Sequence, residues 1–258
     1  MTDTTFVSRD GWTASGIGDI QLYAKAKLDR DKEQRALLSF TDTLFEGFCR
    51  KAAEYQRYWV DDTLLYYSER TQIGAVAPVV DAISESYGLE SPVQRTEQNK
   101  TSRGSLDLWA IYRGVGILSE WKHGFVQYNA AQLGKAEQDK WHAAWAQAES
   151  VSEFDESIGT RGTWRAAFMI VTARSARQRF QPKEDRFPDI DTQITSFLNH
   201  CQCPDMNADY VGICIPDRKL QSKHFARYSN YTSGEYFPFF ALLGRFGPLN
   251  RITRKDRE

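Results

Sequence analysis

Residues 104–122 read GSLDLWAIYRGVGILSEWK and contain two apolar segments separated by a short break. The segments cover residues 106–112 and 115–122, and the break is Arg113 and Gly114, a pair that suits a tight turn. The sequence therefore predicts an antiparallel hairpin. Because the residues on either side of its few charges are apolar, we expect this hairpin in a central sheet that is covered on both faces.

The hairpin brings charged side chains together. A two-residue turn pairs Tyr112 with Val115 and, five residues further along, Asp107 with Glu120. Two opposed carboxylates inside a sheet must share a proton, pair with a cation or hold a metal ion. Lys122 lies two residues after Glu120 and so on the same face. The geometry thus predicts two carboxylates and one ammonium group on one patch.

Two alternatives to this arrangement stay open. A four-residue loop would place Asp107 opposite Lys122 and would keep all three groups close together. The patch could also be a partly buried ion pair of Asp107 and Lys122, with Glu120 solvated at the end of the sheet. If the patch instead binds a metal, Mg²⁺ is the expected ion, because it prefers a few carboxylates and several waters.

The rest of the chain supplies helices and strands around this hairpin. Apolar periodicity predicts a helix over residues 33–58, after an irregular polar arm over residues 1–30. A second helical stretch is expected after the N-cap run Asp61, Asp62 and Thr63, kinked or restarted at Pro78 and closed by Gly88. The later elements are expected to be strands at 93–96, 106–112 and 115–122, a helix at 130–149, a strand at 163–172, a helix at 189–200, and a strand at 210–215.

Length and composition limit the class of protein. The 258 residues carry 34 acidic and 33 basic side chains, which excludes a globally basic nucleic-acid binder but not a local basic patch. No secretory signal and no apolar stretch of about 20 residues is visible, so we expect a cytoplasmic protein with no membrane partner. The expected division is an N-terminal arm and helical extension at 1–60, and an α/β domain at 61–258 with an aromatic and basic C-terminal tail.

The motif of the hairpin resembles a known superfamily. Residues 104–107, GSLD, followed after a turn by Glu120, Trp121 and Lys122, resemble the motif of the PD-(D/E)XK nucleases. The order helix, three strands, helix, strand over about 63–215 is similar to the core of that superfamily. Leu106 stands where the motif has proline. The resemblance implies an α/β fold with a restriction-endonuclease-like core, which is a mixed central sheet flanked by helices in αβββαβ order.

The resemblance also implies roles for individual residues. Asp107 and Glu120 would bind the metal together with the carbonyl group of Trp121, and Lys122 would be the catalytic lysine. Many members add an acidic ligand from the helix before the first strand, and Glu69 matches it best. The alternative for Glu69 is a first-turn helix acid or a surface partner of a neighbouring arginine.

The implied function is a metal-dependent nuclease that hydrolyses phosphodiester bonds of nucleic acid, with DNA favoured over RNA only through the resemblance. Its cofactor would be Mg²⁺, with Mn²⁺ as a substitute. Lys135, Arg174, Arg177 and Arg179 are the expected contacts to nucleic acid, because phosphates attract clustered basic residues. A homodimer is expected if one site per chain cuts both strands. The alternative function is a non-catalytic nucleic-acid-binding or assembly module that keeps the same fold.

Overall fold

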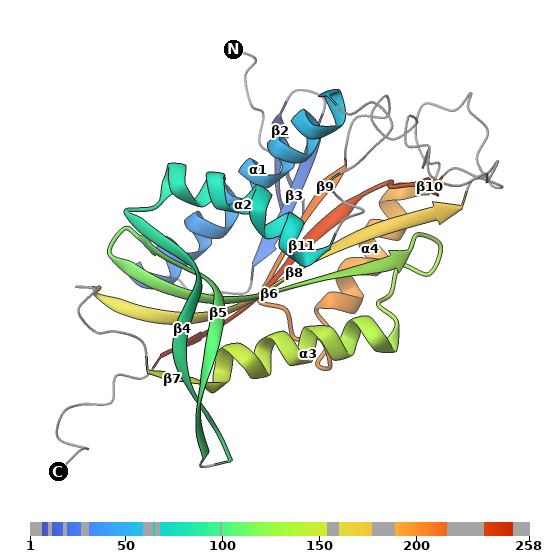
Figure 1. Ribbon diagram of the computed structural model, residues 1–258. Coiled ribbons are helices and arrows are strands. Elements are labelled where there is room, and N and C mark those ends of the chain that lie inside the picture. Colours follow the sequence, from blue (N-terminus) through green and yellow to red (C-terminus); the bar gives the residue numbers. More distant parts are fainter. Residues whose placement is uncertain are drawn as a thin grey trace, which may run out of the picture.

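The structure is a computed structural model that describes residues 7–9, 12–17, 20–26, 31–58, 64, 68–98, 100–153, 160–176, 189–215 and 235–249. Figure 1 shows the helices and strands. In chain order they are β1 (Val7–Arg9), β2 (Trp12–Ile17), β3 (Ile20–Ala26), α1 (Lys32–Tyr58), α2 (Glu69–Ile83), β4 (Ser86–Glu97), β5 (Lys100–Tyr112), β6 (Val115–Gln127), α3 (Lys135–Ser150), β7 (Val151–Glu153), β8 (Gly162–Ala176), α4 (Ile190–Cys201), β9 (Tyr210–Ile215), β10 (Glu235–Tyr236) and β11 (Phe240–Pro248).

The strands form one mixed sheet in the order β1-β2-β3-β9-β11-β8-β6-β5-β4-β7, and β10 pairs with β8 outside this path. Strands β6 and β8 run parallel, whereas the other paired strands run antiparallel. A parallel pair needs a long crossover connection, and α3 lies within it. The predicted order of helix, three strands, helix and strand is therefore present as α2, β4, β5, β6, α3 and β8, with the short β7 before β8.

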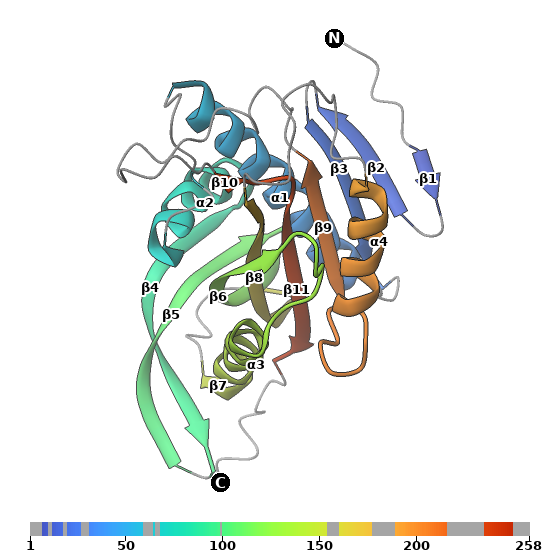
Figure 2. The same cartoon turned by 90° about the vertical axis from the view of Figure 1, so that its right-hand side faces the viewer.

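Helices cover both faces of the sheet (Figure 2). One core joins α1 and α2 to the sheet, and in it the ring of Trp121 lies 4.7 Å from that of Phe168. A second core joins α3 and α4 to the other face, around the buried Trp141 and Phe197. The mixed α/β class with a sheet flanked by helices is thus confirmed. None of the helices in the described ranges is long and apolar enough to cross a membrane.

Two segments for which no strand was predicted contain strands. The prediction of an irregular arm over residues 1–30 is wrong, because β1, β2 and β3 lie there and β3 pairs with β9. The aromatic tail contains β11, which pairs with β8 on one side and β9 on the other. Strands β3 and β11 each have a partner that is distant in sequence, and local sequence patterns do not reveal such pairing. The division of the chain at residue 60 stays a prediction.

Helix α2 differs from its predicted bounds at both ends. It begins at Glu69, after Ser68 as N-cap, and not after Asp61. It continues through Pro78, although proline cannot donate the backbone hydrogen bond, because Val76, Val79 and Val80 pack into the core. It ends at Ile83, so Gly88 is not its cap and lies within β4.

The turn of the central hairpin has the predicted length. Arg113 and Gly114 have φ values of 50° and 72°, as a two-residue type I′ turn requires. Strand β5 consequently pairs with β6 in the predicted register, from Tyr112–Val115 to Leu108–Ser119. The four-residue-loop alternative is therefore excluded.

We expect Gly114→Ala to lower the free energy of unfolding by about 1 kcal/mol, because a side chain disfavours the left-handed backbone of this turn. The matched control is Gly74→Ala on α2. A methyl group there meets open space in a helix, so this variant should gain about 0.5–1 kcal/mol. Urea denaturation of both variants measures the difference. A loss in both variants would contradict the conformational argument.

Candidate active site

The central sheet divides into two ribbons beside the predicted patch. The pairing of β5 with β6 ends at Leu108–Ser119. Beyond that point β4 and β5 stay paired to each other as far as Glu97–Lys100, and β6 and β8 stay paired as far as Gln127–Arg174. In Figure 1 the β4–β5 ribbon curves away from β6 and β8. We call this point of divergence the fork.

Asp107 is the first residue of β5 beyond the paired region, on the side of the fork. Its Oδ2 accepts a hydrogen bond of 2.8 Å from the backbone N–H of Trp121. Asp107 and Glu120, which were predicted to face each other, thus lie one residue beyond the last backbone pair, Leu108–Ser119. The hydrogen bond to the side chain of Asp107 takes the place of a backbone hydrogen bond between the strands. Burial raises the pKa values of both Glu120 and Glu69, and the negative charge of Asp107 raises both further, so the three carboxylates interact electrostatically.

Glu120 is buried at the fork. Only 4% of its side chain is exposed, and its Oε1 accepts a hydrogen bond from the guanidinium group of Arg95. Burial raises the pKa of Glu120 to about 7, opposed by the hydrogen bond from Arg95 and assisted by the charge of Asp107. The alternative that placed Glu120 in solvent at a sheet end is therefore wrong.

Lys122 lies between two of the predicted metal ligands. Its Nζ donates a hydrogen bond of 2.8 Å to the carbonyl oxygen of Trp121 and lies 3.4 Å from Oε1 of Glu69. Its ion-pair partner is thus Glu69 and not Asp107. Glu69 is the first residue of α2, where the helix dipole favours a negative charge. Partial burial raises its pKa, against the opposing effect of Lys122.

Arg95 on β4 belongs to the site, although the sequence interpretation assigned it no role. Besides Glu120, its guanidinium donates to the carbonyl oxygen of Ser105 at 2.6 Å, and to the carbonyl oxygen of Gln147 and the hydroxyl of Ser150 at the end of α3. It therefore connects β4 to β5, β6 and α3.

The side chain of Arg95 crosses β5 at a glycine. A Cβ atom on Gly104 would collide with the Cδ and Nε atoms of Arg95. Only glycine thus leaves space for this arginine to reach Glu120. Arg95 and Gly104 are visible in the sequence, but only the pairing of β4 with β5 shows that they lie close together.

The chemistry of the donors fits Mg²⁺, since carboxylate and carbonyl oxygens are the ligands that this ion prefers. However, among the residues that the structure describes, no group of three or more His, Cys, Asp or Glu side chains is arranged to hold a metal ion. The guanidinium of Arg95 neutralises Glu120, and the ammonium of Lys122 neutralises Glu69. Metal binding would thus require at least one of these acidic side chains to change its rotamer.

The structure describes two of the four predicted contacts to nucleic acid. Lys135 begins α3, has 82% of its side chain exposed and forms an ion pair with Asp139 at 2.5 Å. The guanidinium of Arg174, near the end of β8, lies over the ring of Phe125 at 4.1 Å. Arg177 and Arg179 lie outside the described residues. A role in nucleic-acid binding stays a prediction for all four basic residues.

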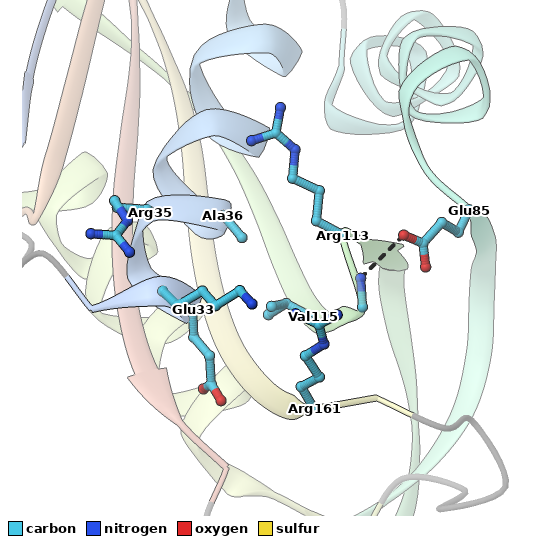
Figure 3. A pocket seen from close by; sticks show the side chains of 9 residues that line it. Glu33, Arg35, Ala36, Glu85, Arg113, Val115 and Arg161 are labelled. Carbon is cyan, nitrogen blue, oxygen red and sulfur yellow. Dashed lines mark hydrogen bonds between the residues drawn. The ribbon is translucent and has the colours of Figure 1, made fainter.

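A cavity of about 790 Å³ lies at the opposite end of the β5–β6 hairpin (Figure 3). One of its acids, Glu33, accepts a hydrogen bond from the indole of Trp164, and the other, Glu85, accepts one from the backbone N–H of Gly114. These acids therefore help to hold the turn and neighbouring strands. The predicted site residues do not line this cavity, which is formed by Lys32, Glu33, Arg35, Ala36, Glu85, Arg113, Gly114, Val115 and Arg161.

Comparisons of the chain with protein-family models, with curated proteins and with solved structures found no match. The roles suggested for the residues of the fork therefore rest on the sequence motif and on the geometry described above.

The raised pKa of Glu120 makes stability depend on pH. The ordinary value is 4.5, and the folded-state value is about 7. Between these values the folded protein binds a proton more tightly than the unfolded chain does. The contribution of Glu120 to the free energy of unfolding therefore falls as the pH rises from about 4.5 to 7.

We expect Arg95→Met to lower the free energy of unfolding by about 3 kcal/mol at pH 8, because it leaves a buried carboxylate without its partner. The loss should be smaller at pH 5, where a proton neutralises Glu120. Urea denaturation at the two pH values provides the measurement. Arg50→Met is the control, since Arg50 forms an exposed pair with Glu46 and should cost less than about 1 kcal/mol at either pH. An equal loss at both pH values for Arg95→Met would contradict the charge argument.

Proposed function

We propose that the protein is a Mg²⁺-dependent nuclease that hydrolyses phosphodiester bonds, with DNA as its favoured substrate and Mn²⁺ as a substitute ion. The observation that carries this proposal is the convergence of Asp107, Glu120, Lys122 and Glu69 at the fork of the central sheet. Asp107, Glu120 and Lys122 are the residues of the motif GSLD…EWK, and Glu69 comes from the preceding helix.

The topology supports a restriction-endonuclease-like core within this proposal. Helix α2 precedes the antiparallel strands β4, β5 and β6, and α3 then leads to β8, which lies parallel to β6. This is the αβββαβ order that the sequence resemblance implies. The fork opens between β5 and β6, the two strands that carry the motif.

The proposed mechanism assigns each group at the fork a task. Asp107, Glu120 and the carbonyl oxygen of Trp121 would hold the ion, with Glu69 as a further ligand, and the bound ion would supply Lewis-acid catalysis. Lys122 would orient or deprotonate the attacking water, or stabilise negative charge at the phosphorus. Its Nζ is already held by the Trp121 carbonyl and Glu69, which reduces the freedom of its long side chain. The hydrogen bond from Trp121 N–H fixes the carboxylate of Asp107.

One observation favours a second candidate, a binding or assembly module without catalysis. Arg95 and Lys122 already neutralise Glu120 and Glu69, so these two acids have charge partners without a metal ion. Such a site could be a structural network only. The two functions differ in whether Mg²⁺ binds.

The test of catalysis is cleavage of plasmid DNA by the purified protein with Mg²⁺. We expect Lys122→Met and Asp107→Ala each to lower the cleavage rate by about 10²-fold or more, because each removes a group that acts on the reacting phosphate or water. Lys51→Met, at an exposed position of α1, should cut at the wild-type rate. Equal cleavage by all four proteins, or no cleavage of any nucleic acid, would overturn the assignment.

Thermal unfolding with increasing Mg²⁺ separates the two functions. A nuclease of the proposed kind should unfold at a higher temperature once Mg²⁺ exceeds its dissociation constant, because ligand binding stabilises the folded state. Asp107→Ala should lose this increase, whereas Lys51→Met should keep it. An unchanged unfolding temperature in the wild-type protein would favour the binding module.

A further inference from the structure

The β4–β5 ribbon continues well beyond the fork and has an exposed end. On its outer edge, β7 pairs with β4 only at Gln94 and Arg95. Beyond Arg95, β4 and β5 pair only with each other within the described part of the chain. Both views show this end projecting from the body of the molecule (Figures 1 and 2). We call residues 96–98 and 100–103 the ribbon tip.

The ribbon tip is entirely polar. All seven of its described residues are exposed, namely Thr96, Glu97, Gln98, Lys100, Thr101, Ser102 and Arg103. Without an apolar side chain, the tip has nothing to bury against a hydrophobic surface of another protein. Two bases and one acid give it a net positive charge. Hydroxyl, amide and basic groups of this kind form hydrogen bonds with phosphates and base edges.

The dimensions of the tip match a groove of duplex DNA. Within the tip, from Arg103 to Lys100, the strand advances three residues, or about 10 Å. The major groove of B-form DNA is about 12 Å wide and about 8.5 Å deep, and it admits a two-stranded ribbon. By contrast, the major groove of an RNA duplex is deep and narrow, and side chains cannot read it. By shape, the tip therefore fits the groove of the DNA duplex better than that of the RNA duplex.

The base of the ribbon is fixed to the fork. Arg95 is the last residue before the tip, and its guanidinium binds Glu120 on β6 and the end of α3. Only 12% of this side chain is exposed. The direction of the tip relative to Asp107 and Lys122 is thus held by a buried ion pair. A duplex bound by the tip would therefore lie in a defined orientation relative to the fork.

We propose that the ribbon tip inserts into the major groove of duplex DNA and positions the duplex at the fork. The proposal takes the fork as the active site from the proposed function. The binding that it describes, however, does not require cleavage.

The experiment measures binding to fluorescently labelled nucleic acids by anisotropy, with the full chain in EDTA so that Mg²⁺-dependent cleavage is prevented. The probes are a DNA duplex of about two helical turns, the RNA duplex of the same sequence, and the DNA single strand. The test variant is Lys100→Ala/Arg103→Ala. The control variant, Arg50→Ala/Lys51→Ala, removes the same charge from exposed positions on α1.

We expect the wild-type protein to bind the DNA duplex most tightly. The tip variant should bind it at least about 10-fold more weakly, and its salt dependence should fall by up to about two counterions, one for each lost phosphate contact. The control should bind as the wild type does. Urea denaturation should show free energies of unfolding within about 1–2 kcal/mol of one another for all three proteins, since the substituted side chains are exposed.

Four results would overturn the inference. These are wild-type affinity in the tip variant, an equal loss in both variants, a wild-type preference for the RNA duplex or the single strand, and the absence of duplex binding by the wild-type protein. Failure of the proposed function alone would give a different set of results. DNA binding would still depend on the tip, but Mg²⁺ would neither stabilise the protein nor support cleavage.

Discussion

A carboxylate buried inside the sheet is the constraint on which the fork depends. Glu120 is almost completely removed from water, and an unpaired charge there would be costly. Arg95, two strands away on β4, forms an ion pair with this carboxylate. Its side chain needs a glycine at position 104 to pass β5, and it also forms hydrogen bonds with the end of α3. One ion pair therefore fixes the relative positions of β4, β6 and α3.

A second polar contact satisfies the backbone at the point where the strands separate. At the fork β5 no longer pairs with β6, so the backbone N–H of Trp121 needs another acceptor. The carboxylate of Asp107 provides it, and Lys122 caps the carbonyl oxygen of the same residue. The motif side chains thus complete the hydrogen bonding of the diverging edge. The same contacts also hold Asp107 and Lys122 at the fork.

The parts of the fold that depend on local sequence were predictable, and those that depend on distant partners were not. The turn at Arg113 and Gly114 fixed the register of the hairpin, and the apolar run of β9 was predicted with its observed bounds. Strands β3 and β11 were missed, and each pairs with β9; β3 lies far from β9 in the chain. At the site, Asp107, Glu120 and Lys122 followed from the hairpin alone. The role of Arg95 depends on Gly104 and α3, which only tertiary structure brings to it.

The charges at the fork also connect metal binding to substrate binding under the proposed function. Asp107, Glu120 and Glu69 with Arg95 and Lys122 have a net charge of −1 when all are ionised. A divalent ion alone would make the cluster positive, and a phosphodiester group would then restore neutrality. Without either, a proton on Glu120, whose pKa burial raises to about 7, would also bring the cluster to neutrality. An ion and a nucleic-acid phosphate should therefore bind cooperatively, since each lowers the electrostatic cost of the other.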